Sequence, residues 1–146
     1  MLVQLLTGGL ISVANFGIHA SMTGLIIVIT RRIARTTDYL HVFTRSSALM
    51  LVTVLALTAT HVLEIAVWAA FMAVACITVP NITPLEFAFE NYVALGYGDV
   101  VAGGGWRLIG PIMALNGLLL IGWSVAVLFE VIRMAKLQFG TAVAMK

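Results

Sequence analysis

The residues best placed to do chemistry form a short glycine-containing run, Ala94 to Val101, between two long apolar stretches. Gly96 and Gly98 permit backbone conformations with positive φ, so successive carbonyl oxygens can turn the same way. A row of carbonyls turned toward one axis can replace the hydration shell of a cation. Backbone this irregular is tolerated at membrane depth only where it is buried in protein or lines a watery cavity. We therefore expect a re-entrant loop that binds a cation through its backbone.

Two carboxyl groups lie on either side of the two glycines. Glu90 lies six residues before Gly96, and Asp99 follows Gly98 directly. If a helix carrying Glu90 packs behind the run, the two carboxyls meet in a poorly solvated place, where both cannot ionise cheaply. We expect them to share one proton and to support the run. The alternative is that Glu90 hydrogen-bonds backbone or water alone.

The composition is that of a membrane protein. Hydrophobic residues make up 62% of the chain and charged residues 10%, which leaves too little polar surface to cover a soluble globule. The basic residues lie at the ends of apolar runs and not on one face, so no nucleic-acid partner is expected. No nucleophile, base and oxyanion donor occur at a readable spacing, so we expect neither an enzyme nor an organic cofactor.

Three apolar stretches reach or exceed the roughly 20 residues that a hydrocarbon core requires. They cover residues 2–30, 47–79 and 108–134, and the second stops at Pro80. The segment between the last two is too polar and glycine-rich to span, but its part from Leu85 to Leu95 is apolar. The sequence therefore predicts three transmembrane helices.

The apolar part of that segment has the start signals of a short helix. Thr83 is a possible N-cap, Pro84 suits the first helical position, and Glu86 adds a carboxylate to the first turn. The C-terminal end of this helix leads directly into the glycine run. We expect a short re-entrant helix whose negative dipole end favours a cation.

The order of helix, re-entrant helix, Gly-Tyr-Gly-Asp run and helix, from about Ser47 to Lys136, resembles the pore module of the potassium-channel superfamily. The resemblance implies an all-α membrane protein with a pore helix and filter loop between transmembrane helices two and three. Residues 47–146 would form the pore module. Residues 1–46 would add an extra N-terminal helix and a cytoplasmic linker.

The resemblance also implies a function, passive conduction of K⁺ through a selectivity filter. The filter positions are Ala94, Leu95, Gly96, Tyr97 and Gly98. Potassium filters usually carry threonine where this chain has Ala94, so a hydroxyl of the innermost ion site is absent. Two alternatives stay open: a weakly selective cation channel on the same fold, and a non-conducting accessory subunit of a larger membrane complex.

A carbonyl ring of this kind is built from four loops, and the chain carries one. We therefore expect a homotetramer, in which each chain meets three further copies of itself within the lipid bilayer. The third span would line the cavity. Gly117 and Gly122 lie where inner helices often carry a gating glycine, or they permit close helix packing. Asn116 lines the cavity or forms interhelical hydrogen bonds.

A polar pair interrupts the second span. His61 and Glu64 are three residues apart and so share a helical face. Ionisable groups at membrane depth are functional candidates, and this pair could bind a proton or a metal. Two residues lack the further ligands of a closed metal site, which favours a buried pair that braces the helix against the pore. His19 in the first span raises the same question.

The basic residues also indicate orientation. Seven of the eight lie on one side of the spans: Arg31, Arg32, Arg35 and Arg45 between the first two, and Arg133, Lys136 and Lys146 after the third. Only Arg107 lies on the other side. The positive-inside rule predicts a cytoplasmic C-terminus, with the N-terminus and filter mouth outside the plasma (inner) membrane.

Overall fold

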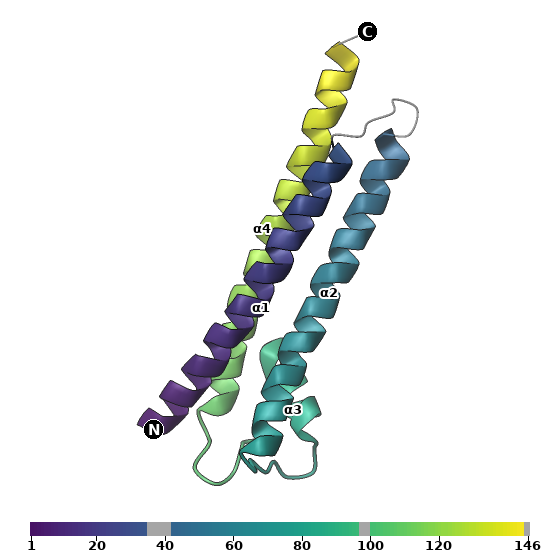
Figure 1. Ribbon diagram of the computed structural model, residues 1–146. Coiled ribbons are helices and arrows are strands. Elements are labelled where there is room, and N and C mark those ends of the chain that lie inside the picture. Colours follow the sequence, from purple (N-terminus) through teal and green to yellow (C-terminus); the bar gives the residue numbers. More distant parts are fainter. Residues whose placement is uncertain (35–41, 97–99, 145–146) are drawn as a thin grey trace.

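The computed structural model describes residues 1–34, 42–96 and 100–144, and over these ranges the chain is helical, with no β-strand. The helices are α1 (Leu2–Ala34), α2 (Val42–Val74), α3 (Pro84–Tyr92) and α4 (Ile109–Ala144). The three long helices run side by side, and α3 lies at the end of the bundle where α1 begins and α2 ends (Figure 1). The expected all-α fold is confirmed.

Each long helix contains a stretch long and apolar enough to cross a membrane. These stretches are Leu2–Arg32, Ser46–Val74 and Ile109–Met134. Large apolar side chains on all three remain exposed in the single chain, Leu10, Leu55 and Leu118 among them. So much apolar surface is expected to meet lipid or further protein.

The second helix ends five residues before the predicted Val79, so that boundary was wrong. Cys76 adopts a positive φ of 51°, and its N–H donates to the carbonyl of Ala73. The N–H of Ile77 donates to the carbonyl of Met72, and both of these side chains are buried in one apolar cluster. This left-handed cap with its apolar contact ends α2 before Pro80 can.

The start of α3 is as predicted. The Thr83 hydroxyl accepts from the N–H of Glu86 at 3.2 Å, and the Thr83 N–H donates to the Glu86 carboxylate at 2.7 Å. Pro84 occupies the first turn, where its missing N–H costs nothing. The backbone and hydroxyl of Thr83 hold the pKa of Glu86 below its ordinary value of 4.5.

The α3 segment is re-entrant. Tyr92, at its C-terminal end, hydrogen-bonds Glu64 on α2, ten residues before α2 ends, which corresponds to a depth of about 15 Å along that helix. The chain then returns to the same end of the bundle, where the N–H of Gly103 donates to the carbonyl of Thr78 at 3.1 Å. The segment therefore enters and leaves on one side.

Close approach of α4 to the end of α3 depends on Gly117. A Cβ atom at this position would lie 1.9 Å from the carbonyl oxygen of Tyr92. At Gly122, one turn and a half further on, a Cβ atom would meet nothing within 4 Å in the described residues of the chain. Gly117 and Gly122, for which the sequence suggested the same role, therefore have different surroundings.

Acid should weaken the start of α3 through Glu86. Because the folded pKa lies below 4.5, the stabilisation is fully present above that pH and is lost as the pH falls through the folded pKa. Amide hydrogen exchange of α3, corrected for intrinsic rates, should show falling protection below about pH 4 in the wild type. Glu86→Gln keeps the acceptor without its charge, so it should respond less. An equal response in both proteins would refute the capping role.

Gly117→Ala should destabilise the protein by about 1–3 kcal/mol, because the tight contact with α3 must open. Gly122→Ala is the matched control, and it should leave stability unchanged or raise it by up to about 1 kcal/mol through helix propensity. Thermal unfolding in detergent micelles compares the two. If both substitutions shift the midpoint alike, Gly117 is not a packing residue.

Candidate functional site

The predicted filter begins where α3 is capped. The N–H of Ala94 donates to the carbonyl of Asn91, and the N–H of Leu95 donates to that of Glu90, each at 2.9 Å. Ala94 has a φ of 54°, a left-handed conformation that costs a non-glycine residue about 1–2 kcal/mol. This cap ends α3 at Tyr92. The sequence had suggested that the helix continues to Leu95, so that boundary was wrong.

Gly96 follows with a φ of 42°, so its predicted positive φ is confirmed. Its N–H points back to the carbonyl of Glu90 at 3.4 Å, which ties the first filter residues to the last turn of α3. Tyr97, Gly98 and Asp99 lie outside the described residues, and with them the expected contact between the Glu90 and Asp99 carboxyls. The orientation of the later filter carbonyls therefore stays a prediction.

The start of the predicted filter is uncovered in a single chain. The side chain of Leu95 is 58% exposed and that of Val93 is 38% exposed, although Tyr92 beside them is fully buried. Apolar side chains in this position, beside a residue that reaches about a third of the way along α2, need a neighbour that the described residues of one chain do not supply.

A cluster of polar side chains reaches the C-terminal end of α3 and joins all four helices. We call it the Glu64 cluster, and its members are His19 on α1, His61 and Glu64 on α2, Tyr92 on α3 and Ser124 on α4. The side chains of Glu64 and His19 have no exposed surface, and that of His61 is 19% exposed. The predicted pair of His61 and Glu64 is thus part of a larger assembly.

The carboxylate of Glu64 is shared among three helices. Its Oε1 lies 2.9 Å from Nδ1 of His19, and its Oε2 lies 3.0 Å from Nδ1 of His61. The hydroxyl of Tyr92 also donates to Oε2. Glu64 therefore connects α2 to α3. The sequence left such a bracing contact open beside proton or metal binding.

The far side of each imidazole faces one hydroxyl. Nε2 of His61 lies 2.8 Å from Oγ of Ser124, and Nε2 of His19 lies 3.3 Å from the same atom. Glu64, the two histidines and Ser124 therefore form a closed ring of hydrogen bonds. Tyr92 joins this ring from the pore helix.

A second polar group packs beside the ring. The Oδ1 of Asn116 accepts from Nδ2 of Asn15 at 3.1 Å and from Nε1 of Trp68 at 3.0 Å. Asn116 is only 2% exposed and lies among α1, α2 and α4. Of the two roles that the sequence left open for it, this geometry corresponds to interhelical hydrogen bonding.

His19, His61 and Glu64 each offer one ligand atom within 4.8 Å of the others, which is close enough for a metal ion. In the structure, however, both carboxylate oxygens and all four ring nitrogens already have hydrogen-bond partners. In the structure these atoms therefore form a hydrogen-bonded cluster.

The sequence contained part of this cluster. Asn15 and His19 are four residues apart on α1, and polar residues of a membrane helix face the bundle interior. That spacing could have joined His19 to Glu64. Nothing in the sequence pointed to Tyr92, because tyrosine is common near membrane interfaces.

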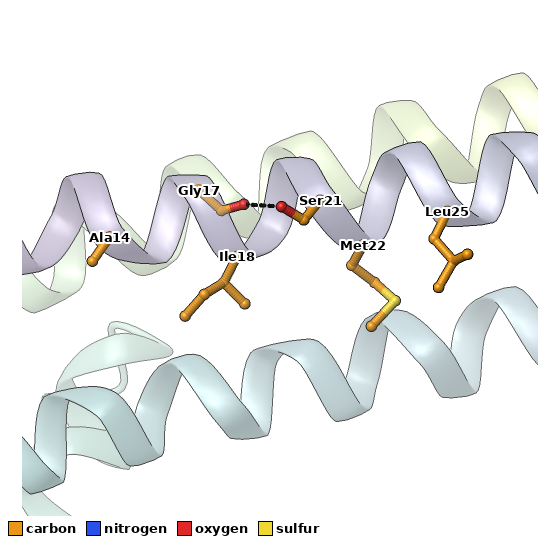
Figure 2. Close-up of a pocket in the computed structure, with 6 residues that line it drawn as sticks. All are labelled: Ala14, Gly17, Ile18, Ser21, Met22 and Leu25. Carbon is orange, nitrogen blue, oxygen red and sulfur yellow. Dashed lines mark hydrogen bonds between the residues drawn. The ribbon is translucent and has the colours of Figure 1, made fainter.

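A groove of about 660 Å³ runs along α1, and it differs from the cluster in chemistry. Figure 2 shows Ala14, Ile18, Met22 and Leu25 directed toward α2. The groove also includes Ser21, whose hydroxyl is occupied by the carbonyl of Gly17 at 2.8 Å. The described residues that line this mainly apolar groove offer no free polar group, so the groove has no means of orienting a polar ligand.

Comparison with protein families gives one match, which covers more than half of the chain. The family model described as "Ion channel" matches residues 48–134, from the second turn of α2 to well inside α4. No curated protein and no solved structure matches. The matched segment contains α3, the filter run and the His61–Glu64 pair, with α1 outside it. A re-entrant helix between two membrane-spanning helices, together with this match, shows that the chain belongs to the ion channel family.

Proposed function

We propose that the protein conducts K⁺ passively through a pore made by four copies of the chain. The observation that carries the proposal is the re-entrant α3 followed by left-handed backbone at Gly96, within a segment that matches the ion channel family. Glycine in this conformation lets successive carbonyls turn toward one axis. The permeant ion would be the only ligand that this function needs.

The direction of α3 supports cation binding. Its capped N-terminus lies at the end of the bundle, and its C-terminus reaches the depth of Glu64 and Gly117. The negative end of the helix dipole therefore points into the bundle, about a third of the way along α2 from the end where α3 enters. In a tetramer, four such ends would converge and lower the energy of a cation in the cavity.

The uncovered start of the filter supports the tetramer. Val93 and Leu95 are exposed beside a buried Tyr92, so further copies around an axis would cover them. The sequence provides one filter run per chain, and a ring of carbonyls needs four. These observations need no subunit other than copies of this chain. An accessory role in a larger complex would give a different outcome in the test below.

The basic residues support an orientation. The start of α1 and the capped N-terminus of α3 lie at one end of the bundle, and the end of α4 lies at the other (Figure 1). With Arg133 and Lys136 near the second end, the positive-inside rule places that end in the cytoplasm. The filter would then open to the outside of the plasma (inner) membrane.

A second candidate is a less selective cation channel on the same fold, and Ala94 favours it. Its methyl group offers no hydroxyl to the innermost site, and its left-handed backbone disfavours a β-branched replacement such as threonine. Selectivity then rests on the backbone carbonyls that follow.

Ion flux from liposomes tests the proposal. The purified wild-type protein should pass K⁺ at least tenfold faster than Na⁺, and native mass measurement should give four chains. Gly96→Ala should abolish flux. Gly105→Ala is the matched control, because Gly105 also has a positive φ, 83°, and open space around it, but lies outside the filter run. It should keep both flux and selectivity.

Three results would contradict the proposal. Equal K⁺ and Na⁺ flux would establish the less selective channel. A folded wild-type protein that assembles without fourfold symmetry and passes no ion would favour the accessory subunit. Equal loss of flux in Gly96→Ala and Gly105→Ala would mean that backbone strain anywhere near the loop, and not the filter, limits conduction.

A further inference from the structure

We propose that the groove along α1 binds the acyl chain of an anionic phospholipid, whose headgroup lies against Arg32. The groove and this arginine belong to α1, which lies outside the segment that matches the ion channel family. The site is therefore separate from the proposed filter, and the proposal does not depend on ion conduction.

The groove continues into a smaller cavity of about 70 Å³, which has Met22 and Leu25 in its lining as the groove does. This cavity lies between two helices, because Leu49 and Val52 of α2 line it together with Ile29 of α1. Figure 2 shows the side chains of Met22 and Leu25 directed toward α2. The groove and the cavity together form one mainly apolar path along α1, which suits a hydrocarbon chain.

The length of this path matches one leaflet of a bilayer. The path begins at Ala14, near the middle of the apolar stretch Leu2–Arg32, and its last lining residue on α1 is Thr30. These two positions lie about 24 Å apart along the helix. One leaflet with its headgroups is about 20 Å thick. The path therefore corresponds to a lipid of one leaflet and not to a membrane-crossing partner helix, which would follow the whole span.

Arg32 continues the face of α1 that forms the groove. Ile18, Leu25 and Arg32 follow one another at intervals of seven residues, so they lie on one face of the helix. The side chain of Arg32 is exposed in the last turn of α1. Arg31 is exposed as well, but it lies about 100° around the helix from Arg32. A phosphate at the end of the path would therefore meet Arg32, whose guanidinium can donate two parallel hydrogen bonds to it.

The charge at this end of the path favours an anion. Arg31 and Arg32 occupy the last turn of α1, and no acidic residue occurs in that helix. On α4, the carboxylate of Glu130 pairs with Arg133 of its own helix at 3.1 Å. Among these described side chains, arginines outnumber carboxylates, which favours an anionic headgroup over a zwitterionic one.

Thr30 supplies a polar group near the headgroup end. Its side chain has no exposed surface, and its hydroxyl has no hydrogen-bond partner among the described residues. Thr53, which also lines the cavity, donates its own hydroxyl to the carbonyl of Leu49 at 2.8 Å. A buried hydroxyl without a partner is unfavourable. An ester carbonyl, which in a phospholipid lies between the acyl chain and the phosphate, would supply the acceptor that Thr30 lacks.

Native mass spectrometry of the full chain tests the preference for an anionic headgroup. The protein is titrated with phosphatidylglycerol or with phosphatidylcholine of the same acyl chains. Phosphatidylglycerol should bind at about one per chain and about fivefold more tightly, which is the effect of one arginine near an anionic lipid. Arg32→Gln should abolish most of this preference. Arg31→Gln is the matched control, because it removes the same charge from another face, and it should keep the preference.

A second pair of variants tests the place of the acyl chain. Ala14→Phe puts a ring into the deep end of the groove, so it should weaken the binding of both lipids and leave their ratio unchanged. Ala20→Phe puts the same ring on an exposed part of α1 that lines neither the groove nor the cavity, so it should change neither affinity. Thr30→Val should weaken both lipids, because both carry the ester carbonyl.

Three results would overturn the proposal. Equal affinity of the wild type for the two lipids would rule out recognition of an anionic headgroup. Equal losses in Arg31→Gln and Arg32→Gln would mean a general attraction between a basic helix end and anionic lipid. A changed number of chains per assembly in Ala14→Phe, with lipid affinity unchanged, would mean that another copy of the chain covers the groove.

Discussion

The arrangement of this protein depends on one buried carboxylate, that of Glu64. A charge without exposed surface must be paired and hydrogen-bonded, or the structure that buries it is unstable. Glu64 finds its donors on three helices, in His19, His61 and Tyr92. Since few placements of α1, α2 and α3 bring these donors together, the carboxylate holds the C-terminal end of α3 in its place within the bundle. The proposed filter follows directly after that end.

The contacts of Glu64 give the first helix a structural role that the family match alone does not indicate. The matched segment starts after α1, yet α1 contributes His19 to the ring and Asn15 to the hydrogen bonds of Asn116. The sequence suggested a boundary between residues 46 and 47, with an added helix before it and a pore module after it. These contacts cross that boundary. In this chain the added helix completes the polar interior of the helix bundle.

The parts of the fold and of the site that could be predicted are those whose sequence signal lies within a few consecutive residues. Length and apolar content predicted the three spans, and Thr83 and Glu86 predicted the start of α3, because a capping box is contained in four consecutive residues. The ends of α2 and α3 were missed. Both are left-handed caps formed by Cys76 and Ala94, whereas the usual signal is glycine or asparagine. His61 and Glu64 were found from their spacing, but Tyr92 and Ser124 join them only after the helices pack.

The central claim is that each subunit anchors its own pore helix through Glu64, so that the filter faces a shared axis. An experimental structure of the assembled protein in lipid and K⁺ tests it most directly. It should show the Tyr92 hydroxyl on the Glu64 carboxylate of the same subunit, with the carbonyls of Leu95 and Gly96 forming rings about a fourfold axis. Glu64 paired with a neighbouring subunit, or turned toward the pore, would contradict the claim.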